Sequence, residues 1–242
     1  MPYAAVNGLN MYYEVHGDGP PLLLLHGGTG SIPEPWIPFF SPRFRVVAPE
    51  FMGHGRTGDA LDRPFHYHDL AEDMVELIRQ LEIESVVIVG YSDGGIIGLD
   101  LAINHPILVS RLVTTGANAR VDGYTEDNVE WVRTFDPDEE PVPAAYGRLS
   151  PDGAEHWPAL LRRLRPMWTT EPAFGSDSLQ RITAPTLLVV GDRDIIRLEH
   201  AVEMYRTLPH AQLCVVPNTG HGAMPKEIVL KFLEEGPIDT GH

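Results

Sequence analysis

The sequence contains little cysteine and no long hydrophobic run. Among its 242 residues Cys214 is the only cysteine, so a framework of disulfides within the chain is excluded. No stretch approaches the ~18 apolar residues that a membrane-crossing helix needs, and the first residues lack the basic and apolar regions of a secretory signal. We therefore expect a cytoplasmic protein without a membrane partner.

Positive charge is scarce as well. The chain has 18 Lys and Arg against 34 Asp and Glu, which gives a net charge of −16 with neutral histidines. Such a charge repels the phosphates of nucleic acids, so a nucleic-acid partner is excluded and a small-molecule substrate is favoured. Hydrophobic residues make up 43% of the chain, which at this length is enough for a substantial core.

Short runs of leucine and β-branched residues alternate with amphipathic segments along most of the chain. This alternation is typical of an α/β protein, with a mostly parallel sheet and helices on both faces. Asn7-Gly8 separates the first two runs and predicts a hairpin. Eight strands are predicted, at 3–6, 11–16, 22–25, 44–48, 85–89, 111–115, 186–190 and 212–216, and helices are predicted at 69–81, 94–104, 198–208 and 227–233.

The segment 116–181 interrupts this alternation. It contains seven prolines spread between positions 137 and 172 and three of the four tryptophans, Trp131, Trp157 and Trp168. We predict that it forms a lid inserted into a core of residues 1–115 and 182–242. Its aromatic side chains predict a modest, mostly apolar pocket, and we expect two of four residues, these tryptophans and Phe135, to line it. The sequence does not indicate which two.

The run Gly90-Tyr91-Ser92-Asp93-Gly94-Gly95 directly follows one predicted strand and directly precedes a predicted helix. A nucleophile on a tight strand-to-helix turn needs small residues two positions before and two after it, and Gly90 and Gly94 hold those positions around Ser92. Centring the turn on Asp93 would place bulky Tyr91 at one of them. Ser92 is therefore the predicted nucleophile, the alternative being a glycine-rich turn with an incidental serine.

With this motif and four others, the chain resembles the α/β-hydrolase fold superfamily. The resemblance implies an eight-stranded sheet and catalytic residues in the chain order Ser, acid, His. The Ser-Asp-Gly-Gly run is similar to that of the biphenyl-hydrolase-like, valacyclovir-hydrolase group, and the His-Gly-Gly loop to that of proline iminopeptidases. Glu50 departs from the aspartate common in relatives. The other motifs that carry the resemblance are His26-Gly27-Gly28-Thr29-Gly30, Gly53-His54-Gly55-Arg56-Thr57, Gly191-Asp192-Arg193-Asp194 and Gly220-His221-Gly222.

A serine hydroxyl needs an imidazole to take its proton and a carboxylate to orient that imidazole. His221 lies in a loop after a predicted strand, whereas His200 and His210 flank a helix, so His221 is the predicted base. For the acid, the family pattern of a glycine followed three residues later by aspartate selects Asp194. Asp192 then forms a turn.

An oxyanion needs backbone donors that are in position before charge develops. The N–H of Asp93, next to the nucleophile, is one predicted donor. The resemblance implies that Gly28 supplies the other, with Thr29 as the alternative, while His26 holds the loop.

The side chain of Asp93 puts negative charge beside the site where an alkoxide forms. One hypothesis is that it pairs with a substrate ammonium, which favours α-amino-acid esters or amides. The alternative is that it points away and bonds backbone or solvent. The lid cluster Arg162, Arg163 and Arg165 leaves a similar choice between a substrate carboxylate and a solvated helix face.

We thus predict a serine hydrolase that cleaves carboxylic esters, and by extension amides, through an acyl-enzyme. Neither a cofactor nor a metal is expected, because the run 66–69, with two histidines and an aspartate, is not followed by the further histidine of a dinuclear site. A cofactor-free haloperoxidase or perhydrolase and a carbon–carbon bond hydrolase use a similar triad and stay as alternatives. A ligand-binding protein without catalysis is the alternative from another class.

Overall fold

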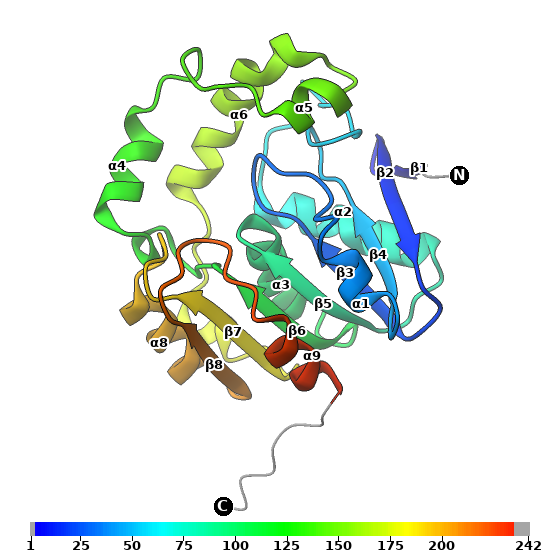
Figure 1. Ribbon diagram of the computed structural model, residues 1–242, viewed down its shortest axis with the longest axis vertical. Coiled ribbons are helices and arrows are strands. Elements are labelled where there is room, and N and C mark those ends of the chain that lie inside the picture. The colour runs from blue at the N-terminus through cyan, green and yellow to red at the C-terminus, as the bar shows by residue number, and fades with distance from the viewer. Residues whose placement is uncertain (1–2, 235–242) are drawn as a thin grey trace, which may run out of the picture.

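The computed structural model describes residues 3–234, in which eight strands form one open sheet (Figure 1). The strand order is β1-β2-β4-β3-β5-β6-β7-β8, and all neighbours are parallel except the pairs β1–β2 and β2–β4. The strands are β1 (Tyr3–Val6), β2 (Leu9–His16), β3 (Pro21–Leu25), β4 (Arg45–Pro49), β5 (Val86–Tyr91), β6 (Val109–Thr115), β7 (Thr186–Gly191) and β8 (Ala211–Val216).

Helices cover both faces of this sheet, which explains why its central strands are apolar on both sides. Along β3, Leu23 and Leu25 belong to the core cluster under α2 and α3, whereas Leu22 and Leu24 belong to the cluster with α1 and α9. Successive side chains of a strand point to opposite faces, so a run of leucines fills both cores. The helices are α1 (Ile37–Phe40), α2 (Tyr67–Gln80), α3 (Asp93–Asn104), α8 (Leu198–Thr207) and α9 (Lys226–Glu234).

The chain between β6 and β7 contributes no strand to the sheet and folds mainly into helices above one end of it (Figure 1). Arg163 joins this part of the chain to the core through an ion pair with the buried Asp59 and a hydrogen bond of 2.9 Å to the carbonyl of Ala60. The elements of this insertion are η1 (Val121–Gly123), α4 (Glu126–Thr134), α5 (Ala144–Leu149), η2 (Ala154–His156), α6 (Trp157–Thr170) and α7 (Ser176–Leu179).

The predicted α/β class and the mostly parallel eight-stranded sheet are confirmed. The strand ends differ by up to two residues: β2 begins at Leu9 rather than at Met11, because Leu9 pairs with Val6 across the hairpin. Helix α1 was not expected. It has only four residues and therefore no apolar period that a sequence could reveal.

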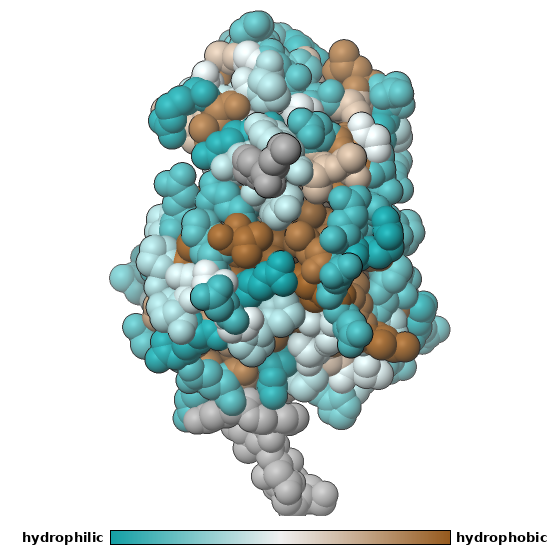
Figure 2. Space-filling model, turned by 90° about the vertical axis from the view of Figure 1, so that its right-hand side faces the viewer, coloured by the Kyte–Doolittle hydropathy of each residue, from teal (hydrophilic) through white to brown (hydrophobic). Residues whose placement is uncertain are grey.

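The surface on the side of β1 and β2 is mostly hydrophilic, with hydrophobic residues gathered near its middle (Figure 2).

None of the helices within residues 3–234 has the length and apolar character needed to cross a bilayer.

Candidate active site

Ser92 stands on the turn between β5 and α3, in a backbone conformation that most residues avoid. Its φ is +52° and its ψ −119°, which costs on the order of 1–3 kcal/mol for a residue other than glycine. The turn is too tight for side chains around it: a Cβ on Gly90 would lie 2.3 Å from the carbonyl oxygen of Gly94, and one on Gly94 would lie 2.5 Å from that of His26. The two glycines thus allow the strand and the helix to approach closely around Ser92.

Ser92, His221 and Asp194 form one hydrogen-bonded chain, although they follow three different strands. His221 Nε2 lies 3.0 Å from Ser92 Oγ, and His221 Nδ1 lies 2.7 Å from Asp194 Oδ1. The Asp194 carboxylate is buried and also accepts hydrogen bonds from the backbone N–H groups of Gly191 (3.3 Å) and Ile196 (3.2 Å). Because the Asp194 carboxylate can only accept, Nδ1 of a neutral His221 carries the proton and donates it. The free lone pair of the ring is then on Nε2, which faces Ser92.

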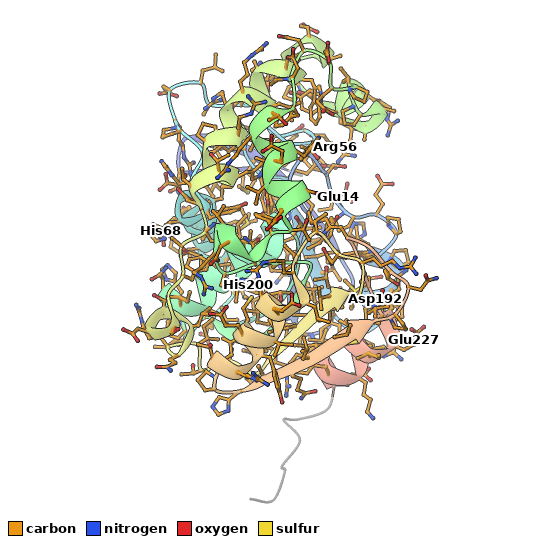
Figure 3. The ribbon with its side chains drawn as sticks, turned by 90° about the vertical axis from the view of Figure 1, so that its left-hand side faces the viewer. Glu14, Arg56, His68, Asp192, His200 and Glu227 are labelled. Carbon is orange, nitrogen blue, oxygen red and sulfur yellow. The ribbon has the colours of Figure 1, made fainter. Side chains whose placement is uncertain are left out.

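Asp192, the other candidate acid, lies outside this chain. It follows β7 at the surface of the molecule (Figure 3), and its Oδ1 accepts a hydrogen bond of 3.0 Å from the N–H of Thr219. Hydrogen bonds from the backbone of Asn218 and Thr219 lower the pKa of Asp192. Asp192 therefore shapes the loop before His221 and does not contact the imidazole.

Two buried histidines hold the loop 26–30 next to Ser92. His26 donates from Nδ1 to the carbonyl of Gly27 (2.7 Å) and accepts at Nε2 from the N–H of Phe51 (3.1 Å). Burial lowers the pKa of His26 to about 3. His26 is thus a neutral linker between two loops and takes no part in proton transfer.

His54 repeats this arrangement on the other side of the loop. It donates from Nδ1 to the carbonyl of Met52 (2.8 Å) and accepts at Nε2 from the N–H of Thr29 (3.1 Å). Burial lowers its pKa as well. Since the N–H of Thr29 is engaged, the alternative oxyanion donor considered for this loop is occupied, which favours Gly28.

Asp93 lies under the pocket with both carboxylate oxygens engaged. The Tyr67 hydroxyl donates to Oδ1 (2.8 Å) and the Trp168 indole N–H donates to Oδ2 (3.0 Å). The residue is 5% exposed, and this burial raises its pKa against the opposing effect of the two donors. A Cβ on Gly28 would come within 2.4 Å of Oδ2, so the glycine loop rests directly on this carboxylate.

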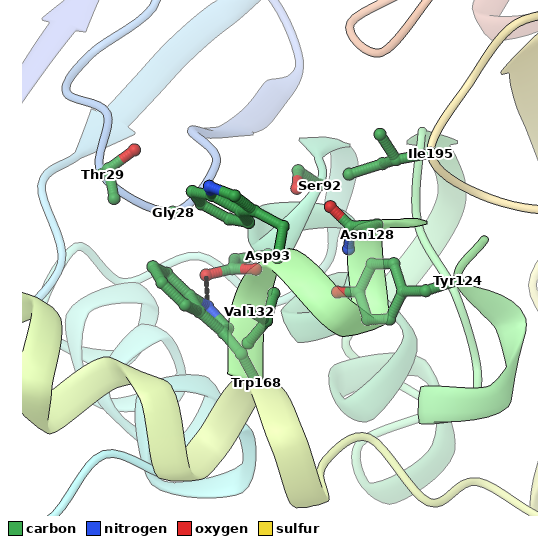
Figure 4. Close-up of a pocket in the computed structure, with 10 residues that line it drawn as sticks. Gly28, Thr29, Ser92, Asp93, Tyr124, Asn128, Val132, Trp168 and Ile195 are labelled. Carbon is green, nitrogen blue, oxygen red and sulfur yellow. Dashed lines mark hydrogen bonds between the residues drawn. The ribbon is translucent and has the colours of Figure 1, made fainter. Parts of the chain in front are cut away.

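These residues surround a pocket of about 120 Å³ that opens beside Ser92 (Figure 4). The core contributes one side of it, and α4, α6 and the loops before α4 and after β7 contribute the other. The lining residues are Gly28, Thr29, Ser92, Asp93, Tyr124, Asn128, Trp131, Val132, Trp168 and Ile195.

The sequence profile of the alpha/beta hydrolase family matches residues 22–229, which is most of the chain and includes the whole site. The chain belongs to the alpha/beta hydrolase family. Two similar proteins are "Putative carbamate hydrolase RutD" of Agrobacterium fabrum, 29% identical over 87% of this chain and 91% of that protein, and "Serine hydrolase BPHL" of Homo sapiens, 29% identical over 96% of this chain and 81% of that protein. The alpha/beta hydrolase MGS-M2 from a deep-sea metagenome shares the fold, with a TM-score of 0.81 at 19% identity over 99% of this chain and 100% of that one.

Within this alpha/beta hydrolase only some of the aromatic residues considered for the pocket line it. Trp131 and Trp168 line the pocket, whereas Trp157 does not. Trp157 begins α6 and packs against Tyr146, with the ring centroids 4.9 Å apart, and it is 3% exposed. Trp157 thus lies away from this pocket, because its face of α6 is turned toward the core of the insertion. Phe135 also lies outside the lining residues and stacks on Trp131 at 5.0 Å.

The idea that the arginine cluster of α6 meets a substrate carboxylate is also contradicted. Arg162 pairs with Asp138, Arg163 pairs with Asp59, and the Arg165 guanidinium lies 4.1 Å from the ring centroid of Phe135. None of the three lines the pocket. Each of these side chains serves the packing of the insertion.

Glu50, which departs from the family pattern, is fully buried and neutralised by Arg56. Its Oε1 lies 2.9 Å from Arg56 Nη1, and its Oε2 accepts from the Arg56 backbone N–H at 2.5 Å. Arg56 in turn lies 3.7 Å from Glu14 of β2 (Figure 3). The longer glutamate thus ties the loop 50–57, which carries His54, to the edge of the sheet.

Proposed function

We propose that this alpha/beta hydrolase is a serine hydrolase that cleaves carboxylic esters of small, mostly apolar acyl groups, and the corresponding amides, through an acyl-enzyme on Ser92. The observation that carries the proposal is the hydrogen-bonded chain from Ser92 through His221 to Asp194, with distances of 3.0 and 2.7 Å. Such a chain supplies a nucleophile, a base and an orienting carboxylate in one line.

In the proposed reaction, Ser92 Oγ attacks the ester carbonyl carbon while its proton moves to His221 Nε2. The tetrahedral intermediate collapses, the bond to the leaving group breaks, and His221 returns the proton to the departing alkoxide. Water then attacks the acyl-enzyme with His221 again as base, which releases the acid and restores Ser92. Asp194 stays ionised throughout and stabilises the transient imidazolium.

The negative oxygen of the intermediate would be bound by the backbone N–H groups of Gly28 and Asp93. Support comes from the hydrogen bonds of the neighbouring groups: the N–H of Thr29 is used by His54, and the glycine loop is fixed by two neutral histidines. Donors held in place before the reaction need no reorganisation, and losing one such donor costs ~10²–10³ in rate.

The size and lining of the pocket support a small acyl group. A volume of about 120 Å³ is close to that of the ~150 Å³ protein cavities that hold a ligand the size of benzene. Trp131, Val132, Trp168 and Ile195 provide apolar walls. A short acyl chain fills this space, whereas a long one requires the insertion to move.

Asp93 favours acyl groups that carry an ammonium. Each of its oxygens accepts one hydrogen bond from a side chain and keeps further lone pairs, and the carboxylate lines the pocket. Asp93→Asn tests this role with little disturbance, because the amide oxygen can accept from Trp168 while its NH₂ donates to the Tyr67 oxygen. If Asp93→Asn leaves the preference for amino over acetyl esters unchanged, the ammonium role is wrong.

The reaction class is tested with a fluorophosphonate probe, intact mass measurement, and turnover of p-nitrophenyl acetate, butyrate and octanoate by the wild type and by Ser92→Ala. We expect one adduct per chain on Ser92, faster turnover of the two short esters, and a loss on the order of 10⁶ in kcat for Ser92→Ala. Labelling of Ser92 without ester turnover would point to carbon–carbon or peroxide chemistry. Absence of both from folded protein would favour a ligand-binding role.

A further inference from the structure

One face of α4 closes the pocket over Ser92 and presents a polar side chain to it. Asn128, Trp131 and Val132 are three and four residues apart, so they share one side of the helix, and all three line the pocket. Figure 4 shows the Asn128 amide directed into the pocket beside Ser92 and Tyr124. The amide therefore lies where the acyl group of a substrate would bind.

The Asn128 amide differs from two other polar groups of the pocket in having no partner among residues 3–234. Asp93 accepts hydrogen bonds from Tyr67 and Trp168, and the Tyr124 hydroxyl bonds with the side chains of Tyr67 and Asn118. The backbone N–H of Asn128 donates to Thr125 Oγ1, but its side-chain amide makes no hydrogen bond with any other residue among 3–234.

Filling the pocket removes water from this amide. A polar group that loses its water without gaining a partner opposes binding, whereas a substrate that supplies the partner is favoured. Sites built in this way discriminate strongly against analogues that lack the matching polar group. An apolar residue at position 128 would have sealed the pocket equally well, since Val132 does so one turn later.

We propose that Asn128 is a specificity-determining residue that accepts a hydrogen bond, through Oδ1, from a hydroxyl or amine on the α carbon of the acyl group. The preferred substrates are then esters of small α-hydroxy or α-amino acids. The proposal rests on the proposed ester hydrolysis at Ser92. It is separate from the charge of Asp93, because a neutral hydroxyl satisfies Asn128 without carrying the positive charge that the carboxylate would attract.

Three phenyl esters test this residue, because their acyl groups differ in a single terminal atom: propionate, glycolate and glycinate. We expect Asn128→Leu to lower the preference of kcat/KM for glycolate over propionate, and for glycinate over propionate, by about three- to tenfold each. Turnover of propionate should change least of the three, since its acyl group has no donor for the amide. Asp93→Asn should lower only the preference for glycinate.

A matched control is Glu130→Leu, which introduces the same leucine at an exposed position of the same helix that does not line the pocket. It should leave all three ratios unchanged, and an unchanged rate of fluorophosphonate labelling would verify an intact site in each variant. Equal losses on the three esters in Asn128→Leu, or unchanged ratios, would overturn the role of Asn128 while leaving ester hydrolysis in place. Failure of the wild type to hydrolyse any of the esters would overturn both proposals.

Discussion

The two halves of the pocket are held in place in different ways. On the core side, the groups proposed for the chemistry are held by hydrogen bonds: Ser92, His221 and Asp194 bond to one another, and the loop of Gly28 is fixed by His26 and His54. On the side of the insertion, Trp131 is 47% exposed and the Asn128 amide has no partner among the described residues. The core half is rigid and the α4 half is adjustable.

This difference separates two tasks of the site. Stabilising developing charge requires donors whose positions are set before the reaction, and backbone groups in a packed core meet that requirement. Choosing a substrate requires side chains whose replacement leaves the core intact. The exposed face of α4 meets this second requirement. Helix α6 is intermediate, because Trp168 lines the pocket while its indole is bonded to Asp93.

The largest effect should come from the core half. We expect Asp194→Asn to lower kcat by about 10⁴, because an amide can hold the wrong tautomer of His221 and cannot stabilise the imidazolium. Asp192→Asn, two residues away on the same loop, should keep nearly full activity. Steady-state turnover of p-nitrophenyl acetate measures both variants, and similar losses in the two would contradict the assignment of Asp194.

Two of the three tryptophans of the insertion, Trp131 and Trp157, should separate stability from binding. Trp157 is buried away from the pocket, so Trp157→Ala should lower the free energy of unfolding by about 3–5 kcal/mol and leave the activity of folded protein nearly unchanged. Trp131→Ala should lower it by under about 1 kcal/mol and raise KM several-fold. Urea unfolding and ester kinetics check the pair, and a larger KM effect in Trp157→Ala would break the division of the insertion into pocket face and core face.

A smaller effect concerns the acid sensitivity of the core half. The pKa of His54 is lowered in the folded protein, so below pH ~6.5 the unfolded chain binds a proton at this residue that the folded chain does not. Stability therefore falls as the pH drops from 7 toward 5. In His54→Gln this contribution is absent, and the slope of unfolding free energy against pH should be shallower by up to ~1.4 kcal/mol per pH unit. Equal slopes from urea titrations of the two proteins would show that His54 is not the group responsible.

The strands and the Ser92 turn could be predicted because their signals are local. Short continuous apolar runs mark β3 and β5, and glycines two positions either side mark the serine. The partners of Asp93 could not be predicted in this way: Tyr67 lies 26 residues before it and Trp168 lies 75 residues after it. The sequence offered a choice between ammonium binding and a side chain turned to backbone or solvent, whereas the observed partners are two side chains.

The sequence also could not predict which faces of the inserted helices line the pocket. Trp131 and Trp157 are both aromatic residues on amphipathic helices, and only their packing decides which one meets the pocket. Asn128 was missed, although a signal existed: a polar residue three and four positions before Trp131 and Val132 shares their helix face. Reading that face as a pocket wall would have required knowing that α4 lies over Ser92.

The hydrogen bond between the Trp168 indole and Asp93 limits how this enzyme could be rebuilt. A chimera that exchanged the insertion for that of another hydrolase would remove the indole and leave a buried carboxylate with one donor fewer, directly beside the nucleophile. The graft would succeed only if position 93 were exchanged together with it. The residue after the serine and the end of α6 would therefore have to be exchanged as one unit.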